Sequence, residues 1–282
     1  MEILLIVIVF ILGLVIGSFI NALEYRLEKE KSIKGRSFCP NCEHQLAWYD
    51  LVPVFSFIFL CGKCRYCQKK ISLQYPIVEL LGGLGFAAMA YQSGYLTQIS
   101  VFLSQSIESR NIIFAIVGLI CLLFIAFCLL LVALYDQKTL YVLSGYVYAA
   151  IAVSLIYLLV NYTGVWNVNG LFEYLKPNLL AAAVAAAPFA ILNLVSKGAW
   201  MGAGDIEVAA LLGFLLGWPH FTVALYFAFL VGSVWGIIKV YALKNAGLKS
   251  EMPFAPFLII GIVFAYLFAN PILSLYVNMF IG

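Results

Sequence analysis

Two aspartates are the residues in this chain whose type and setting best suit chemistry. Asp205 follows Gly202, Ala203 and Gly204 where a polar loop meets a new apolar run, and Asp136 closes the apolar stretch from 112 to 135. Carboxylates at a membrane edge are costly to insert and are candidates for function. Two carboxyl groups that share a site do not both ionise easily, so one residue type supplies an acid and a base. Such a pair can activate a water and protonate a scissile amide.

Two other interpretations of the pair remain open from the residues alone. Asp205 has the position of a helix-capping residue, a role worth about 1 kcal/mol, and paired acids can also form a proton relay in a transporter. The flanking glycines favour catalysis, because Gly202 and Gly204 permit close approach by another chain. An extended peptide pressed against Asp205 would use that freedom.

A second candidate site consists of two C-x-x-C pairs, Cys39 with Cys42 and Cys64 with Cys67, with 21 residues between them. Four thiolates with this spacing are typical of a tetrahedral zinc site, and four protein ligands leave no open position for catalysis. A reducing cytoplasm weighs against disulfides or redox chemistry. Cys61 offers an alternative ligand but follows an apolar stretch, and His44 is expected at the surface.

The elements that position these residues are membrane helices. The chain of 282 residues is 65% hydrophobic and 10% charged, far from the composition of a soluble domain. Runs near the ~20 residues needed to cross a bilayer predict an all-α polytopic membrane protein with about eight transmembrane helices. They span residues 3–23, 76–95, 112–135, 141–161, 178–196, 205–218, 221–243 and 254–279.

Charge sets the expected orientation. Fourteen of the sixteen basic residues, including nine from Arg26 to Lys70, fall on one side of eight crossings, and only Arg110 and Lys176 fall opposite. The positive-inside rule makes the first side cytoplasmic and leaves the N-terminus outside. Asp136 and Asp205 are then at the cytoplasmic edge. The net charge of +3 reflects orientation rather than affinity for nucleic acid.

One long polar segment, 24–75, holds five of the seven cysteines and is expected to fold as a small cytoplasmic module resembling a zinc ribbon. External loops are expected near 96–110 and 162–177. Helix packing is the favoured role of three groups of small residues. They are Gly13 with Gly17, the glycines at 82, 83 and 85, and the alanine-rich run 181–187.

Several motifs together resemble the type IV prepilin peptidases, membrane aspartic proteases with a G-x-G-D motif. The motifs are Gly17-Ser18-Phe19-Ile20-Asn21, the paired cysteines, Trp48-Tyr49-Asp50, Gln74-Tyr75-Pro76 with Glu79, Tyr135-Asp136, Gly202-Ala203-Gly204-Asp205, and Pro253-Phe254-Ala255-Pro256-Phe257. The motifs follow one another in the order and spacing of the family, and together they extend over most of the chain.

The resemblance implies a multi-pass protein of the bacterial cytoplasmic membrane, in contact with lipid, that cleaves prepilins or pseudopilins after a glycine at the cytoplasmic face. Asp136 and Asp205 would be the catalytic acids, and Cys39, Cys42, Cys64 and Cys67 the metal ligands. The resemblance also implies N-methylation of the new terminus with S-adenosylmethionine. Residues 1–95 would be associated with methylation and 96–282 would form the peptidase domain.

Two positions depart from the family pattern. Leu143-Ser144 replaces a usual Pro-Asp or Pro-Asn pair, and Glu207 replaces a usual lysine two residues after Asp205. An anion at 207 is expected to disfavour the charged form of a nearby aspartate. Two rival functions are a proton-coupled transporter and a non-catalytic scaffold for pilus or secretion assembly. The sequence makes no prediction of oligomeric state.

Overall fold

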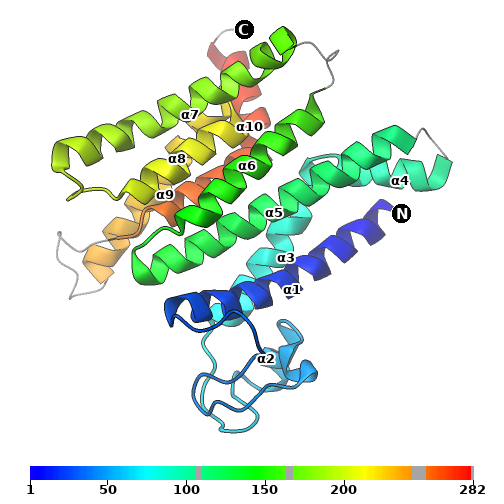
Figure 1. The fold of residues 1–282 in the computed structure, drawn as a ribbon, viewed down its shortest axis with the longest axis vertical. Helices are drawn as coiled ribbons and strands as arrows, with labels where there is room; N and C mark the ends of the chain where they lie inside the picture. Colours follow the sequence, from blue (N-terminus) through cyan, green and yellow to red (C-terminus); the bar gives the residue numbers. More distant parts are fainter. Residues whose placement is uncertain (106–108, 163–167, 243–251, 281–282) are drawn as a thin grey trace. The chain divides into compact units, whose positions relative to one another are not determined.

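The computed structural model describes residues 1–105, 109–162, 168–242 and 252–280, and within these ranges every regular element is a helix. Two isolated β-bridges, Phe38 with Gln45 and Lys63 with Lys70, are the exceptions. The chain divides into unit 1, Met1–Ile112, and unit 2, Ile113–Gly282. Figure 1 shows the helices of both units. The expected all-α fold class is confirmed.

Unit 1 is built on an antiparallel pair of helices, α1 (Glu2–Glu28) and α3 (Gln74–Gln92). Glycines let the two backbones touch, because a Cβ at Gly13 would overlap the main chain of Gly82, and one at Gly17 would overlap Glu79. Gly85 faces open space. Close approach through small residues is a common way for helices to associate in lipid.

The predicted external loop near 96–110 is wrong for most of its described part, which forms the helix α4 (Tyr95–Gln105). Gly94 adopts φ +73°, which ends α3, and the Ser93 hydroxyl accepts the Tyr95 N–H at 3.3 Å. Hydroxyl acceptors of this kind commonly start a helix. Tyr95 and Leu96 are buried, so tertiary packing rather than apolar length explains α4.

Between α1 and α3 the chain forms a small cysteine-containing module with two short helices, η1 (Trp48–Leu51) and α2 (Phe55–Phe59). Arg26, near the end of α1, binds the first part of the module. Its guanidinium donates hydrogen bonds to the carbonyl oxygens of Ile33, Gly35 and Arg36. These contacts fold the loop back toward the helix end.

The described part of unit 2 contains six helices, of which α5 begins just before the unit boundary. They are α5 (Ser109–Thr139), α6 (Ser144–Asn161), α7 (Val168–Ser196), α8 (Ala203–Leu216), α9 (His220–Ala242) and α10 (Ala255–Phe280). The loop expected over 162–177 is wrong from residue 168 on, where α7 has already begun, while 163–167 lie outside the described residues. Pro177 and Pro188 lie inside α7.

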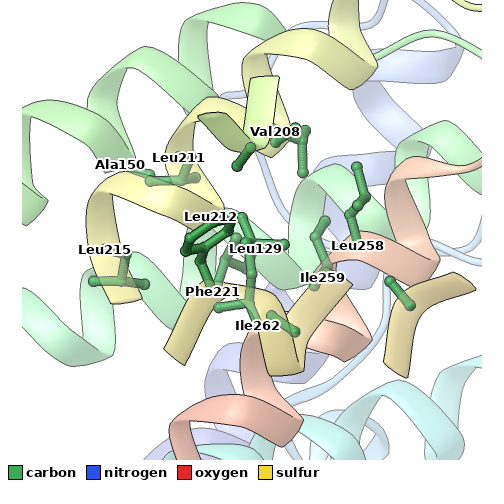
Figure 2. Close-up of a cluster of buried hydrophobic side chains, with 14 of the residues drawn as sticks. Leu129, Ala150, Val208, Leu211, Leu212, Leu215, Phe221, Leu258, Ile259 and Ile262 are labelled. Atoms are coloured by element: carbon green, nitrogen blue, oxygen red, sulfur yellow. The ribbon is translucent and has the colours of Figure 1, made fainter. Parts of the chain in front are cut away.

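Helix α8 is the centre of unit 2 and lies among α6, α7, α9 and α10 (Figure 1). Figure 2 shows its side chains Val208, Leu211, Leu212 and Leu215 packed with Leu129 of α5, Phe221 of α9, and Leu258 and Ile262 of α10. On the α7 side, a Cβ at Gly213 would overlap the main chain of Ala181. The alanine-rich run of α7 thus serves packing, as its composition predicts.

Six described helices are long and apolar enough to cross a membrane, namely α1, α5, α6, α7, α9 and α10. The chain is therefore a multi-pass membrane protein. The predicted count of eight also included α3 and α8, which are not among the six. Helix α8 has 14 residues, or ~21 Å at 1.5 Å per residue, less than the ~30 Å hydrocarbon core.

Candidate functional site

The two predicted acids come from helix ends that the core of unit 2 holds in place. Asp136 lies in the last turns of α5, and Asp205 is the third residue of α8. Asp136 is buried, with 3% of its surface exposed, and Asp205 is half-buried. The carboxyl groups are close enough to interact electrostatically.

Both carboxyl groups also meet the start of α10. The backbone N–H of Ala255, the first residue of that helix, interacts with Asp136 and with Asp205. Asp205 interacts in addition with the N–H of Gly202. The N-terminus of a helix carries partial positive charge and favours nearby anions. Three helix ends therefore converge on one acidic site.

One oxygen of this site has no internal partner. Asp136 Oδ2 is buried and accepts no hydrogen bond from any group in the described part of the chain. Leaving a buried polar oxygen unsatisfied costs about 1–3 kcal/mol, and such atoms in native proteins call for an explanation. One such explanation is that Asp136 Oδ2 contacts a reacting group instead of stabilising the fold.

The two motif glycines differ in role, which changes the sequence-based interpretation of Gly204. A Cβ at Gly204 would overlap the side chain of Val142 in the α5–α6 connection. The group that approaches Gly204 closely is therefore part of this chain and not a bound peptide. Gly202 is exposed and has ordinary backbone angles, φ −72° and ψ 156°. Only Gly202 leaves its side of the motif open to another chain.

Glu207 does not act on the acidic pair as expected. The Tyr148 hydroxyl of α6 donates a hydrogen bond to Glu207 Oε1 at 2.7 Å. Residues two apart on a helix point about 200° apart, so the side chain of Glu207 leaves α8 on the opposite face from Asp205. Glu207, the residue that departs from the family pattern, is therefore hydrogen-bonded to Tyr148.

The four predicted metal ligands come together in unit 1. The sulfurs of Cys39, Cys42, Cys64 and Cys67 all lie within 4.8 Å of one another, and those of Cys39 and Cys67 are 4.0 Å apart. Tetrahedral zinc with Zn–S bonds of ~2.3 Å needs sulfurs ~3.8 Å apart. The cluster fits such an ion. Cys61 and His44 are exposed and lie outside it.

The two C-x-x-C turns are built alike. In the first, Cys39 N–H donates to His44 O at 3.0 Å and Glu43 N–H donates to Cys39 O at 2.9 Å. In the second, Cys64 N–H donates to Lys69 O and Gln68 N–H to Cys64 O, both at 2.9 Å. Glu43 and Gln68 share a positive φ, 56° and 59°. The module is thus a pair of equivalent knuckles around one cluster.

Hydrogen bonds within the second knuckle prepare one thiol for a metal. Burial by itself would raise the pKa of Cys64, but the backbone N–H groups of Cys67 and Tyr66 outweigh it and lower this pKa to about 7. A thiolate is the form that binds metal. These hydrogen bonds therefore favour the thiolate form of Cys64.

Asp50 is a residue of the module whose role the sequence did not reveal. Its carboxylate accepts hydrogen bonds from Arg65 Nε at 2.8 Å, Tyr66 Oη at 3.1 Å and Ala47 N–H at 3.2 Å. Arg65 and Tyr66 lie between the ligands Cys64 and Cys67, so Asp50 fixes the second knuckle from outside. The motif Trp48-Tyr49-Asp50 was a signal, but only the fold supplies the partners.

Fold and site together define a multi-pass helical membrane protein with a pair of neighbouring acids in one unit and a tetrathiol cluster in the other. Residues 122–237 match the Type IV leader peptidase family, and residues 11–93 match the bacterial Peptidase A24 N-terminal domain. Both acids fall inside the first range and all four cysteines inside the second.

Curated relatives extend the match to nearly the whole chain. Three of them are called prepilin leader peptidase/N-methyltransferase. The protein from Bacillus subtilis (strain 168) is 30% identical over 276 residues, 98% of this chain and 99% of the relative. That from Myxococcus xanthus is 32% identical, covering 87% and 66%, and that from Vibrio cholerae is 28% identical, covering 94% and 98%. The chain belongs to the type IV leader peptidase family. No solved structure matches it significantly.

Proposed function

We propose that this chain cleaves the leader peptide of a prepilin or pseudopilin after a glycine, with Asp136 and Asp205 as the catalytic pair. Its membership of the leader peptidase family makes it an enzyme of this class. The observation that carries the residue assignment is the shared contact of both carboxyl groups with the Ala255 N–H.

The environments of the two acids suggest their roles. Asp205 interacts with two backbone N–H groups, those of Gly202 and Ala255, whereas Asp136 interacts with one and also faces the Asp205 charge. Hydrogen bonds to a carboxylate favour its charged form, and a neighbouring anion disfavours it. We therefore assign Asp205 the role of the base and Asp136 the role of the acid.

Hydrolysis then follows from these roles. Asp205 takes a proton from water as the water oxygen bonds to the scissile carbonyl carbon. Asp136 donates its proton to the amide nitrogen as the carbon–nitrogen bond breaks. The proton gained by Asp205 replaces the one that Asp136 gave, so the pair needs only proton exchange to restart. The buried, unsatisfied Asp136 Oδ2 suits a group that serves substrate.

Topology supplies the specificity. Eight helices insert in the bilayer: the six long apolar helices, α3, which packs along α1, and α8, which is enclosed by its neighbours. Within unit 2, Lys138, Lys197 and Lys239 support a cytoplasmic position for the acidic site,, and Lys244 and Lys249 lie outside the described residues. A charged leader would stay in the cytoplasm while the apolar stem of the substrate enters the membrane.

The tetrathiol cluster binds zinc in a structural role. The sulfur positions and the two equivalent knuckles support a tetrahedral ion held by Cys39, Cys42, Cys64 and Cys67. Zinc favours four thiolates, and four protein ligands leave no position for substrate. When bound, the ion would crosslink the two halves of the module rather than take part in hydrolysis.

The chain also N-methylates the new terminus, an activity supported by the shared name of its relatives. S-adenosylmethionine would be the methyl donor. In the described part of unit 1 no strand leads through a glycine turn into a helix, so the residues there do not define a cradle for this cofactor.

The test is cleavage of a precursor peptide by the full chain in lipid nanodiscs. Asp136→Asn and Asp205→Asn each keep side-chain shape and should lower the rate by about 10²–10⁴-fold, the usual contribution of an acid or base. Glu207→Gln is the matched control, because it removes a carboxylate from the same turn of α8 and should keep most of the activity.

Full cleavage by either asparagine variant would overturn the assignment. No cleavage by the unmodified, correctly inserted chain would favour the scaffold. Proton flux across vesicles that depends on both aspartates, without cleavage, would favour the transporter.

A further inference from the structure

An apolar segment, residues 48–60, stands out within the otherwise polar module. It includes η1 and α2, and it lies between the two cysteine knuckles. Its side chains are not collected into a core: Trp48 is 78% exposed and Phe59 81% exposed. Tyr49, Leu51, Val52, Phe55 and Ile58 are also exposed. A run of large exposed apolar side chains of this kind is a candidate interaction surface.

The fold turns one face of α2 outward. Phe55, Ile58 and Phe59 are exposed and have the i, i+3, i+4 spacing of a single helix face,. Phe57, on the other side, packs on Gly62, where an added Cβ would come within 3.1 Å of the Phe57 ring. The outward face is therefore a consistent feature of the helix and is not produced by one misplaced side chain.

A hydrogen bond fixes the depth of the segment along the α1–α3 pair. The Val54 N–H donates to Glu79 Oε2 of α3 at 2.7 Å, and Glu79 lies against Gly17 of α1. Gly17 precedes Arg26 by nine residues, which is about 13 Å along a helix. Since α1 is a membrane span, Val54 lies at the level of its apolar part and not beyond its polar end.

The backbone at this contact is unusual. Val54 has φ +62°, a conformation that is rare for a β-branched residue. Strained backbone persists where the surroundings determine it, and it often marks a functional position. Here the buried carboxylate of Glu79 holds the strained N–H, and the turn places α2 directly after it.

Charge around the segment matches a lipid surface. Exposed Lys63, Lys69 and Lys70 follow α2 in the chain. Aromatic side chains settle at the headgroup level of membranes, and lysines near that surface are attracted to anionic lipids. Aromatic and aliphatic side chains with basic neighbours form the usual composition of an in-plane membrane anchor.

We propose that residues 48–60 insert into the interfacial region of the adjacent leaflet and anchor the tetrathiol module flat against the bilayer. The occupant of the exposed face of α2 is therefore lipid. The depth set by Val54 and Glu79 favours lipid over a partner that approaches from water. This inference does not depend on the proposed peptidase chemistry.

The test uses a tryptophan reporter in the full chain, reconstituted in nanodiscs that contain anionic lipid. All five native tryptophans are replaced by phenylalanine, and Phe59→Trp supplies a single reporter at the most exposed position. Lipids brominated at shallow acyl carbons should quench its fluorescence by at least half, and more than lipids brominated near the chain ends. A far-UV circular dichroism spectrum and a melting temperature close to those of the unmodified chain check that the background is folded.

Lys34→Trp in the same background is the matched control. Position 34 is exposed and follows the end of α1, so brominated lipid should leave its emission nearly unchanged. The proposal is overturned if the reporter at 59 is quenched by aqueous iodide and not by lipid. It is also overturned if neither quencher reaches position 59, which would mean that protein covers the face. Loss of lipid quenching on adding precursor peptide would instead identify a substrate surface.

Discussion

At the scale of single residues, the acidic site depends on a main-chain donor as much as on two side chains. The Ala255 N–H interacts with both Asp136 and Asp205, and it belongs to the first turn of α10. Hydrogen bonds to charged groups contribute about 1.5–3 kcal/mol. Position 255 should therefore matter through its backbone although its side chain is a methyl group.

Ala255→Pro removes that N–H while proline remains acceptable at the first position of a helix. We expect prepilin cleavage to fall by about ten- to a hundredfold, the equivalent of one hydrogen bond to a charged group. Ala255→Val adds similar bulk and keeps the N–H, so it controls for crowding at this buried site. Equal activities of the two variants would contradict a role for the donor.

Asp50 offers a second test at this scale. Burial would raise the pKa of Asp50, but Arg65, the Ala47 N–H and Tyr66 outweigh it and lower this pKa below its ordinary value. A carboxyl whose pKa is lowered on folding stabilises the fold at neutral pH, and that contribution disappears as the pH falls below about 3.9. Asp50→Asn should therefore lower the melting temperature of the metal-free chain near pH 7.

The difference in melting temperature between wild type and Asp50→Asn should shrink steadily below about pH 4. Glu43→Gln is a suitable control, since Glu43 is exposed on the other knuckle. A constant difference down to about pH 3 would show that Asp50 acts through packing and not through charge.

At the scale of elements, sequence patterning located the helices better than their ends. The apolar run 205–218 predicted α8. Helix packing was predicted for the glycines at 13, 17, 82, 83 and 85, and the contact of α1 with α3 confirms it for all but Gly85. The helix over Tyr95–Gln105 was missed, because Gly94 and Ser93 create its start through local geometry rather than through an apolar run. The apolar pattern does not indicate the first turns of α7, because Glu173, Lys176 and Pro177 interrupt the hydropathy.

Gly204 gives a prediction for the contact of α8 with the α5–α6 connection. Gly204→Ala would drive a methyl group into Val142, and overpacking of this kind costs about 1–3 kcal/mol. Because Val142 follows Asp136 by six residues, the shift should move the acids apart and lower cleavage. Gly202→Ala has space around it and should retain most of the activity. Cleavage assays on both variants make the comparison.

If Gly202→Ala were the more damaging of the two, substrate would press on position 202. The sequence predicts that the motif glycines allow a peptide to approach, and this result would support that prediction for Gly202.

At the scale of the whole molecule, sequence alone predicted a multi-pass helical protein with two acids and four cysteines in separate regions. The motif spacing was enough for the cysteines, because each C-x-x-C turn closes locally. The partners of Asp50, Glu79 and Glu207 could not be predicted, since they come from residues 15, 25 and 59 positions away. Long-range polar contacts leave no periodic trace in a sequence.

The cysteine cluster gives a prediction about metal content. Purified chain should carry about one zinc per molecule, and Cys64→Ser should lose it, whereas Cys61→Ser should retain it. Metal analysis together with protease sensitivity of the 24–75 segment would measure the effect. Loss of zinc in Cys61→Ser as well would place Cys61 among the ligands, and full zinc content in Cys64→Ser would contradict the proposed set.

The repeated knuckle has a consequence for how the module tolerates sequence change. Each turn uses main-chain hydrogen bonds at the same offsets from its first cysteine, and a left-handed residue at the same place. Glu43 and Gln68 hold that place although neither is glycine. Each therefore has backbone strain that a glycine would relieve. We expect Glu43→Gly and Gln68→Gly to make it easier for the module to fold around its ion.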